Sequence, residues 1–331
     1  MSSPGFCPVN LFDMPSQKCH PRNRHTGRYD FKKLIETCPE LDHFITLSPF
    51  NELSIDFSNP QAVRTFNRAL LKHFYGLVYW DIPPDFLCPP VPGRADYLHY
   101  AADLLGSANG GIIPKGPQIR VLDIGVGASC IYPIIGNREY GWSFIGSEID
   151  PEALTSADLI IKANPGLASV IQLRKQTSTV QIFNGIVQAK EEFDLAICNP
   201  PFHKSLEEAQ EGSSRKWKNL GRTSRKVPHG KKSVSAISTV SSVSPSAPLL
   251  NFGGKSSELW CPGGEVDFIG RMIRESAAFR NQIFWFTTLV SNADHLPVIY
   301  RSLKKVGVSD TRTIEMSQGQ KRSRLVAWTW R

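Results

Sequence analysis

Short apolar segments that end at glycine, proline or polar residues alternate with helical patterns through most of the chain. The segments 119–124, 142–149, 170–173, 193–198, 283–290 and 324–330 have the length and the apolar content of buried strands. Apolar residues at helical spacing lie between them, at 151–161, 265–279 and 294–305. Alternation of this kind predicts an α/β fold, in which a mainly parallel sheet carries helices on both faces.

The chain before this region is organised differently. Residues 1–57 show no continuous helical or strand pattern, and we interpret them as a basic arm followed by an irregular segment. Residues 58–111 contain helical patterns at 58–74 and 94–105, which the proline-rich segment 81–92 separates. We therefore expect a helical extension at 58–111 and the α/β domain at 112–331, with a long insertion at 213–250 inside that domain.

Basic residues are unevenly distributed. The insertion 213–250 holds eight basic residues and no acidic ones, which equals the formal net charge of +8 of the whole chain. Such stretches favour a polyanionic partner. The sequence has no apolar run long enough to predict a membrane span and no signal-peptide pattern at its start. Seven scattered cysteines without a CxxC pair argue against a disulfide scaffold or a zinc site, so we expect a cytoplasmic protein without a metal.

A glycine motif follows the first predicted strand. Asp123 is succeeded by Gly125-x-Gly127 and Ser129, a pattern that lets the backbone turn tightly and approach a ligand at the carboxyl edge of the sheet. The third glycine of the dinucleotide fingerprint is absent, because Cys130 occupies that position. Glu148 ends the next strand, where a carboxylate can accept hydrogen bonds from both hydroxyls of a ribose.

A second motif, Asn199-Pro200-Pro201-Phe202, follows the strand 193–198. The prolines stiffen the turn, so the Asn199 amide and the Pro200 carbonyl are held at the carboxyl edge of the sheet. Two such acceptors can bind the two hydrogens of an exocyclic amine, and Phe202 can stack on the ring of the base. Alignment with a methyl donor then supplies most of the rate enhancement, and no strong general base is required. The motif thus indicates methyl transfer to the amine of a base.

Together, VLDIGVGAS, the acidic end of the second strand and NPPF resemble the amino-methylating class I S-adenosylmethionine-dependent methyltransferases. The segments 20–24, 81–84, 90–97, 127–133, 251–254, 263–265 and 318–321 are similar to those of the bacterial 23S ribosomal RNA adenine-N6 methyltransferases, which have a eukaryotic branch acting on U6 small nuclear RNA. The resemblance implies a Rossmann-like sheet of seven strands and S-adenosylmethionine as cofactor. It also implies a cofactor site formed by Arg94 at the carboxylate, Gly125 and Ser129 at the methionine end, Glu148 at the ribose, Phe183 and Asn184 beside the adenine, and Asp123, Gly127 and Asn199 nearby.

The resemblance further implies that Asn199, Pro200, Pro201 and Phe202 hold the target adenine, and that the partner is 23S ribosomal RNA, free or within an assembling large subunit. We expect a monomer that contacts RNA phosphates through three basic stretches: Arg22, Arg24 and Arg28; Arg215, Lys216, Lys218, Arg222 and Arg225; and Lys321, Arg322 and Arg324. The residues also leave open a guanine-N2 methyltransferase, a release-factor glutamine methyltransferase and a non-catalytic ribosome-assembly factor. An NAD(P) oxidoreductase is disfavoured, since NPPF has no role in hydride transfer.

Overall fold

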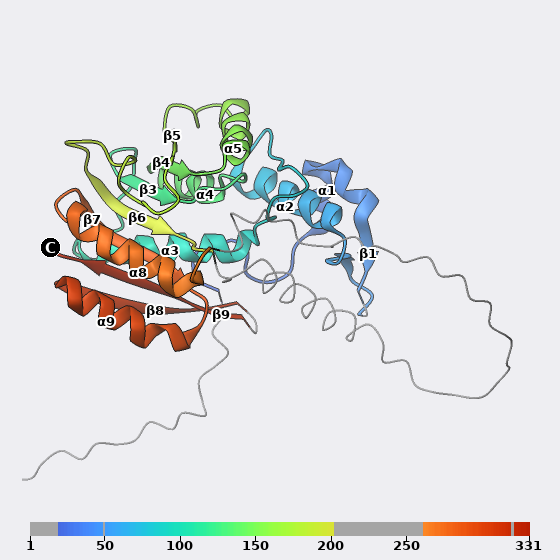
Figure 1. The fold of residues 1–331 in the computed structure, drawn as a ribbon. Helices are drawn as coiled ribbons and strands as arrows, with labels where there is room; N and C mark the ends of the chain where they lie inside the picture. Colours follow the sequence, from blue (N-terminus) through green and yellow to red (C-terminus); the bar gives the residue numbers. More distant parts are fainter. Residues whose placement is uncertain (1–18, 49, 202–260, 319–320) are drawn as a thin grey trace, which may run out of the picture.

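A seven-stranded sheet forms the centre of the computed structural model, which describes residues 19–48, 50–201, 261–318 and 321–331 (Figure 1). The strand order is β5-β4-β3-β6-β7-β9-β8. β9 runs antiparallel to both of its neighbours, and the pairs formed by β3 to β7 are parallel. The strands are β3 (Arg120–Ile124), β4 (Ser143–Glu148), β5 (Ile171–Lys175), β6 (Phe193–Cys198), β7 (Ile283–Val290), β8 (Asp310–Gln318) and β9 (Lys321–Thr329).

The predicted α/β class and the mainly parallel sheet are confirmed, and each of the six strands expected from apolar content is present. The residue pattern alone did not indicate β8, although the resemblance implied seven strands. β8 lies at the edge of the sheet and its residues Thr311, Thr313 and Glu315 are exposed. An edge strand of this kind lacks the apolar run by which the buried strands were recognised.

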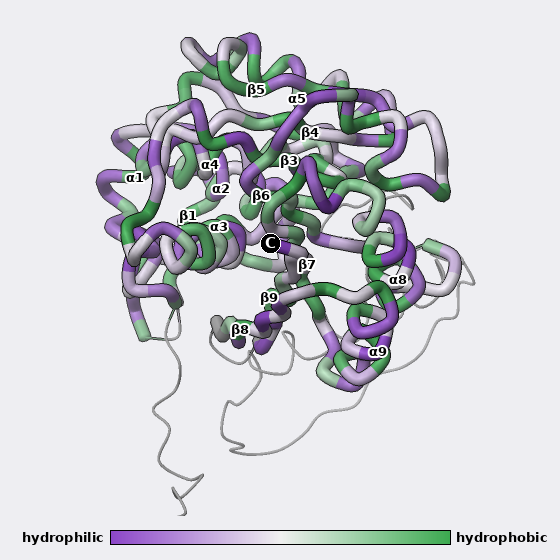
Figure 2. The backbone as a smooth tube through the Cα atoms, turned by 90° about the vertical axis from the view of Figure 1, so that its left-hand side faces the viewer, coloured by the Kyte–Doolittle hydropathy of each residue, from purple (hydrophilic) through white to green (hydrophobic). Residues whose placement is uncertain are grey.

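Two hydrophobic cores, one on each face of the sheet, hold the helices in place. Alternate residues of a strand point to opposite faces, so Leu195 and Ile197 of β6 join one core while Ala196 and Cys198 join the other. The first core contains α2 (Pro60–Tyr75), α3 (Val91–Ser107), α4 (Ile131–Tyr140) and α5 (Pro151–Ala163). The second contains α8 (Gly264–Ser276), η2 (Ala277–Phe279) and α9 (Leu296–Val306), and η3 (Ala293–His295) precedes α9. In Figure 2, α8 and α9 carry hydrophobic and hydrophilic residues in turn, as expected for helices with one buried face.

The helical extension shares its core with the sheet. Residues of α2 and α3 lie in the same cluster as Val121 of β3 and Leu195 of β6. A side-chain cap precedes α2: the Asn59 side chain accepts hydrogen bonds from the backbone N–H groups of Gln61 and Ala62, and Pro60 begins the helix. Gly76 ends α2 in the left-handed conformation, with φ of 64°.

The segment before α2 is more ordered than its sequence suggests. Residues 19–30 are irregular, as predicted for the arm, but α1 (Phe31–Thr37) and η1 (Pro39–Phe44) follow. β1 (Ile45–Leu47) and β2 (Leu53–Ile55) then form a separate antiparallel pair. Leu34 and Leu41 are fully buried, so packing against α2 rather than local periodicity orders this segment.

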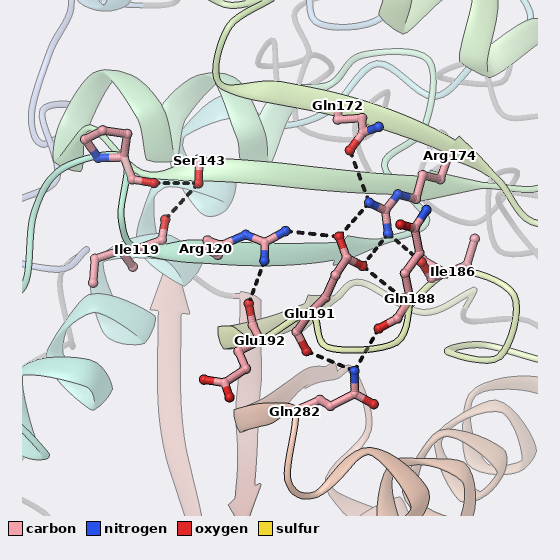
Figure 3. A network of polar contacts seen from close by, with 11 residues as sticks. Ile119, Arg120, Ser143, Gln172, Arg174, Ile186, Gln188, Glu191, Glu192 and Gln282 are labelled. Atoms are coloured by element: carbon pink, nitrogen blue, oxygen red, sulfur yellow. Dashed lines mark hydrogen bonds and ion pairs between the residues drawn. The ribbon is translucent and has the colours of Figure 1, made fainter.

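Glu191, just before β6, is the centre of a network of polar contacts that joins several strands (Figure 3). Its carboxylate accepts hydrogen bonds from Arg174 of β5 at 2.7 Å and from Arg120 of β3 at 3.2 Å. Its backbone carbonyl accepts one from Gln282, which precedes β7. Hydrogen bonding from Arg174 lowers the pKa of Glu191 to about 2. The carboxylate is therefore charged at neutral pH and links β3 to β5, while the backbone carbonyl holds the residue that precedes β7.

Candidate active site

A cavity of about 370 Å³ lies at the carboxyl ends of β3, β4 and β6, and most of the predicted site residues line it. Such a volume is within the range of pockets that hold small molecules and cofactors. Residues from four elements converge here: Arg94 from α3, the Gly125, Gly127 and Ser129 turn after β3, Glu148 at the end of β4, and Asn199 and Pro201 after β6. The carboxyl edge of a parallel sheet, where the strand order reverses, is the usual ligand site in this fold.

The turn between β3 and α4 needs glycine. Gly125 and Gly127 have φ of 74° and 64°, in the left-handed region that other residues rarely adopt. The N–H groups of Gly125 and Val126 both donate to the carbonyl of Ser147 at 3.0 Å, which fixes the turn against β4. A Cβ at Gly125 would have no atom within 4 Å, so open space adjoins the backbone at this point.

Glu148 is held by three backbone N–H groups. Oε2 accepts from Gly127 at 2.9 Å, and Oε1 accepts from Ile149 at 2.8 Å and from Asp150 at 3.1 Å. Burial raises the pKa of the carboxyl group, while these hydrogen bonds favour the charged form and oppose the shift. A carboxylate offers about four acceptor positions, so one remains for a ligand hydroxyl on the side of the cavity.

Arg94 and Asp123 contain buried polar atoms without a partner among the described residues. Arg94 donates to the Tyr132 hydroxyl at 2.8 Å, but its Nε has no acceptor. Both carboxylate oxygens of Asp123 are fully buried and lack a donor. Burial raises the pKa of Asp123 well above its usual range, and the charge of nearby Glu148 adds to the shift. Arg94 lines the cavity, whereas Asp123 lies behind the cavity wall.

Phe183 and Asn184 do not line the cavity, although the resemblance implied that they flank the cofactor adenine. The Phe183 ring is fully buried in the second core, 5.6 Å from Phe279 and 5.5 Å from Phe286 between ring centres. The neighbouring residues Gln181 and Ile182 form the wall instead. Packing of Phe183 against η2 and β7 decides which residues of the loop 181–184 face the cavity. The sequence of the loop alone does not reveal these contacts.

Glu275 of α8 anchors the same loop and was not identified from the sequence. Its carboxylate accepts hydrogen bonds from the backbone N–H groups of Ile182, Phe183 and Asn184 at 2.7–2.9 Å. It also accepts one from the Asn184 side chain at 2.8 Å. The carboxylate therefore fixes the backbone beside Ile182, which lines the cavity. Glu275 lies 91 residues or more from these partners, so local sequence gave no sign of the contact.

Asn199 and Pro201 line the cavity directly after β6. Asn199 Oδ1 is buried and has no hydrogen-bond donor among the described residues. A buried acceptor without a partner is uncommon and requires an explanation such as a missing ligand. Phe202 and the predicted RNA contacts Arg215, Lys216, Lys218, Arg222 and Arg225 lie outside the described residues.

The basic residues of the arm form ion pairs within the chain. Arg22 pairs with Asp103 at 2.7 Å, Arg24 with Glu139 at 2.8 Å, and Arg28 with Glu52. Their side chains remain 38%, 47% and 82% exposed, respectively, so they fasten the arm while keeping part of each guanidinium accessible.

Arg322 and Arg324 lie on the central sheet, unlike the arginines of the arm. They lie near the start of β9, which is antiparallel, so this end of the strand is at the carboxyl edge of the sheet. Arg324 is opposite Val290, the last residue of β7. Lys321 begins the strand at the same edge. This basic stretch is therefore on the same edge as Asn199.

Comparison with known proteins identifies the family. The RNA methyltransferase family matches residues 14–331 of the sequence. The chain belongs to this family. "Ribosomal RNA large subunit methyltransferase F" of Pseudomonas aeruginosa is 54% identical over 311 residues, covering 94% of this chain and 87% of the relative. The protein of the same name from Pseudomonas syringae pv. syringae is also 54% identical, with 94% and 89% covered.

Solved structures show the same fold. The hMettl16 catalytic domain in complex with the MAT2A 3′UTR hairpin 1 superposes with a TM-score of 0.75 and 26% identity, over 95% of this chain and 96% of that one. The N-terminal domain of human METTL16 in complex with SAH gives a TM-score of 0.70 at 24% identity, over 95% and 100% of the two chains. The predictions of an RNA methyltransferase and of a Rossmann-like class I fold are thus confirmed.

Two further findings concern membrane-spanning helices and metal-binding groups in the described residues. No helix in the described ranges is long and apolar enough to cross a membrane. Within the same ranges, His, Cys, Asp and Glu side chains form no group of three that could hold a metal ion.

Proposed function

We propose that this methyltransferase transfers the methyl group of S-adenosylmethionine to the N6 amine of a specific adenosine in 23S ribosomal RNA. The observation that carries the proposal is the buried Oδ1 of Asn199, which has no donor among the described residues and lies at the wall of a cavity that Gly125 and Glu148 also line. The names of the Pseudomonas relatives support ribosomal RNA of the large subunit as the substrate.

Three features of the cavity support S-adenosylmethionine as the methyl donor. The Arg94 guanidinium, whose Nε has no acceptor in the described part of the chain, suits the donor's carboxylate. The remaining acceptor position of the Glu148 carboxylate suits one hydroxyl of a ribose, and the open space at Gly125 allows close approach to the backbone. When bound, the donor supplies an electrophilic methyl group on a positively charged sulfur.

The chain's own residues orient the amine. Asn199 Oδ1 and the Pro200 carbonyl each accept one N–H of the amine, which directs the nitrogen lone pair away from the turn and towards the methyl donor. Pro200 is buried and Pro201 follows it, so the turn does not have to become ordered when the base binds. After transfer one proton leaves the nitrogen to water. Positioning rather than general-base catalysis supplies most of the rate enhancement.

The target adenosine has to be unpaired or flipped out of a helix, because pairing uses the N6 amine. The hMettl16 domain that shares this fold is in complex with a hairpin RNA, which is consistent with a folded RNA substrate. Arg322 and Arg324 at the carboxyl edge, with the exposed parts of Arg22, Arg24 and Arg28, supply candidate phosphate contacts. Action as a monomer in the cytoplasm, where a bacterium assembles its large subunit, fits this function.

The test combines product analysis with a variant. Wild-type protein incubated with S-adenosylmethionine and 23S RNA from a strain lacking the gene should form N6-methyladenosine, detected by nucleoside mass spectrometry. Asn199→Ala should form at least about 100-fold less product and still bind S-adenosylhomocysteine. Asn281→Ala, at an exposed position away from the cavity, is the matched control and should retain activity.

Other products would redirect the assignment. N2-methylguanosine would replace the adenine assignment with a guanine one, and methylated glutamine in a release factor would exclude an RNA substrate. RNA binding with no methyl transfer to any substrate would favour an assembly factor.

A further inference from the structure

Among the residues that the structure describes, the last ones of β6 pair with a strand on one side only. The ladder between β3 and β6 continues to the pair Ile124 and Cys198, whereas pairing between β6 and β7 ends at Ala196 and Phe286. On the open side the hydroxyl of Tyr97, from α3, accepts a hydrogen bond from the backbone N–H of Cys198 at 3.1 Å. Tyr97 therefore replaces the missing strand at the residue directly before Asn199.

The hydroxyl groups of Tyr97 and Thr287 connect the end of β6 to β7. Thr287 of β7 donates to the carbonyl of Ala196 at 2.9 Å. The Tyr97 and Thr287 hydroxyls lie 2.8 Å apart, and either can be the donor. The Tyr97 hydroxyl also lies 3.4 Å from the Cys198 carbonyl, a second acceptor for its single proton. The chain of bonds thus begins at the Cys198 N–H, passes through both hydroxyls and returns to β6 at Ala196.

These groups are sealed from water. Tyr97 and Thr287 are 0% exposed, and Cys198 is 1% exposed. Burial holds the pKa of Tyr97 well above its usual range, so its hydroxyl keeps its proton at any working pH. Loss of one hydroxyl leaves a buried donor or acceptor unpaired, which the backbone can relieve by moving.

The same helix also reaches the donor side of the cavity. Arg94 lies about one turn before Tyr97 on α3. The Tyr97 ring packs edge-on against Tyr132, with ring centres 5.4 Å apart and planes at 89°. Tyr132 accepts the hydrogen bond from Arg94 and lines the cavity. One turn of α3 thus joins the proposed donor carboxylate site to the end of β6.

We propose that Tyr97 is a positioning residue that fixes Asn199 and Pro200 in register with the methyl donor. It acts through the Cys198 peptide and the Thr287 hydroxyl, without contacting either substrate. The inference rests on the proposed function for its effect on catalysis, whereas its effect on the β6 backbone follows from the hydrogen bonds alone.

The first test needs no substrate. Tyr97→Phe removes the hydroxyl and keeps the ring, so amide hydrogen exchange in a peptide covering 195–199 should become faster. Tyr140→Phe is the matched control, because it removes another buried hydroxyl, bonded to His99 at 2.6 Å, that lies away from the cavity. This control should leave exchange at 195–199 unchanged. Equal protection in wild type and Tyr97→Phe overturns the inference.

The second test separates positioning from binding. Tyr97→Phe should lower kcat by about 10- to 100-fold, because small misplacements of reacting groups have effects of this size. Affinity for S-adenosylhomocysteine should change by less than about twofold, and Tyr140→Phe should keep its kcat. If Tyr97→Phe retains full kcat on an RNA that the wild type methylates, the inference is wrong while the proposed function stands. If the wild type forms no product, the proposed function fails and hydrogen exchange still decides the anchoring role.

Thr287 provides a second route should Tyr97→Phe fail to fold. Thr287→Val keeps the shape but loses the hydroxyl and should reproduce the loss of kcat. Thr287→Ser keeps the hydroxyl and should restore most of the activity. Equal kcat in the valine and serine variants contradicts a role for the hydroxyl chain.

Discussion

At the scale of single residues, Glu148 has two tasks. It fixes the turn through the N–H of Gly127 and it presents an acceptor to the cavity. In Glu148→Gln an NH2 group replaces one carboxylate oxygen and faces a backbone N–H. Two donors then lack an acceptor, and this destabilises the turn by about 1–3 kcal/mol. We therefore expect S-adenosylhomocysteine to bind at least about tenfold more weakly, as measured by titration calorimetry.

A control variant separates this effect from a general change of charge. Asp158→Asn removes a carboxylate on the exposed side of α5, where it pairs with Lys162 at 2.6 Å. Its affinity for S-adenosylhomocysteine should equal that of the wild type. Unchanged affinity in Glu148→Gln would show that the carboxylate serves the turn alone.

The site residues that could be predicted from the sequence are those whose position follows from the local strand pattern. Gly125, Glu148 and Asn199 follow strands, and the ends of neighbouring parallel strands meet at one edge, so the strand pattern was sufficient. Phe183 and Glu275 depend on contacts between segments about 90 residues apart, which no local pattern reveals. Tyr97 belongs to a segment that was recognised, but its hydroxyl contact depends on where β7 stops pairing with β6.

At the scale of elements, the sequence missed α4 and β8 for different physical reasons. α4 contains Pro133 in its first turn, where proline is tolerated, and Gly136, which is unfavourable in a helix interior. It forms because its residues are buried between α3 and the sheet. A Cβ at Gly136 would lie 2.4 Å from the Phe144 ring, so the glycine allows the helix to approach β4. β8 was missed for the opposite reason, because an edge strand is only half buried.

The docking of the arm against α2 predicts a dependence of stability on pH. His25 of the arm contacts Tyr75 at 2.8 Å and is almost fully buried, and burial lowers its pKa from 6.5 to about 4. Between pH 6.5 and about 4, His25 is therefore protonated in the unfolded chain but stays neutral in the folded chain. Stability is complete above pH 6.5 and decreases as the pH falls towards about 4.

Thermal unfolding of His25→Gln tests this prediction. The variant lacks the titrating group, so its Tm should decrease less steeply than that of the wild type as the pH falls through this range. His43→Gln removes an exposed histidine and should follow the wild-type curve. Parallel curves for the wild type and His25→Gln would mean that His25 does not contribute to the acid sensitivity. His99, whose pKa burial lowers to about 3, adds a further contribution in all three proteins.

At the scale of the whole molecule, the net charge of +8 equals the charge of one segment of the sequence. Residues 213–250 carry eight basic side chains and no acidic ones, so the rest of the chain is formally neutral. The arm arginines are paired with acidic residues within the fold, which leaves them less charge to offer to phosphates. The segment lies outside the described residues and follows Asn199-Pro200-Pro201-Phe202 in the chain. The formal charge that can attract RNA is thus concentrated in a segment that follows Asn199 closely in the sequence.

Deletion of residues 213–232, which include all eight basic side chains, should weaken RNA binding and reduce its dependence on salt. For every phosphate that the protein no longer neutralises, the slope of log affinity against log salt should become shallower by about 0.7–0.9. Affinity for S-adenosylhomocysteine should stay nearly unchanged, because the described residues of the cavity supply Arg94 and Glu148. Deletion of the uncharged 233–248 stretch is the matched control, since it shortens the chain without removing charge. If the two deletions affect the salt slope equally, chain length rather than charge governs RNA binding, and the basic residues only solvate the insertion.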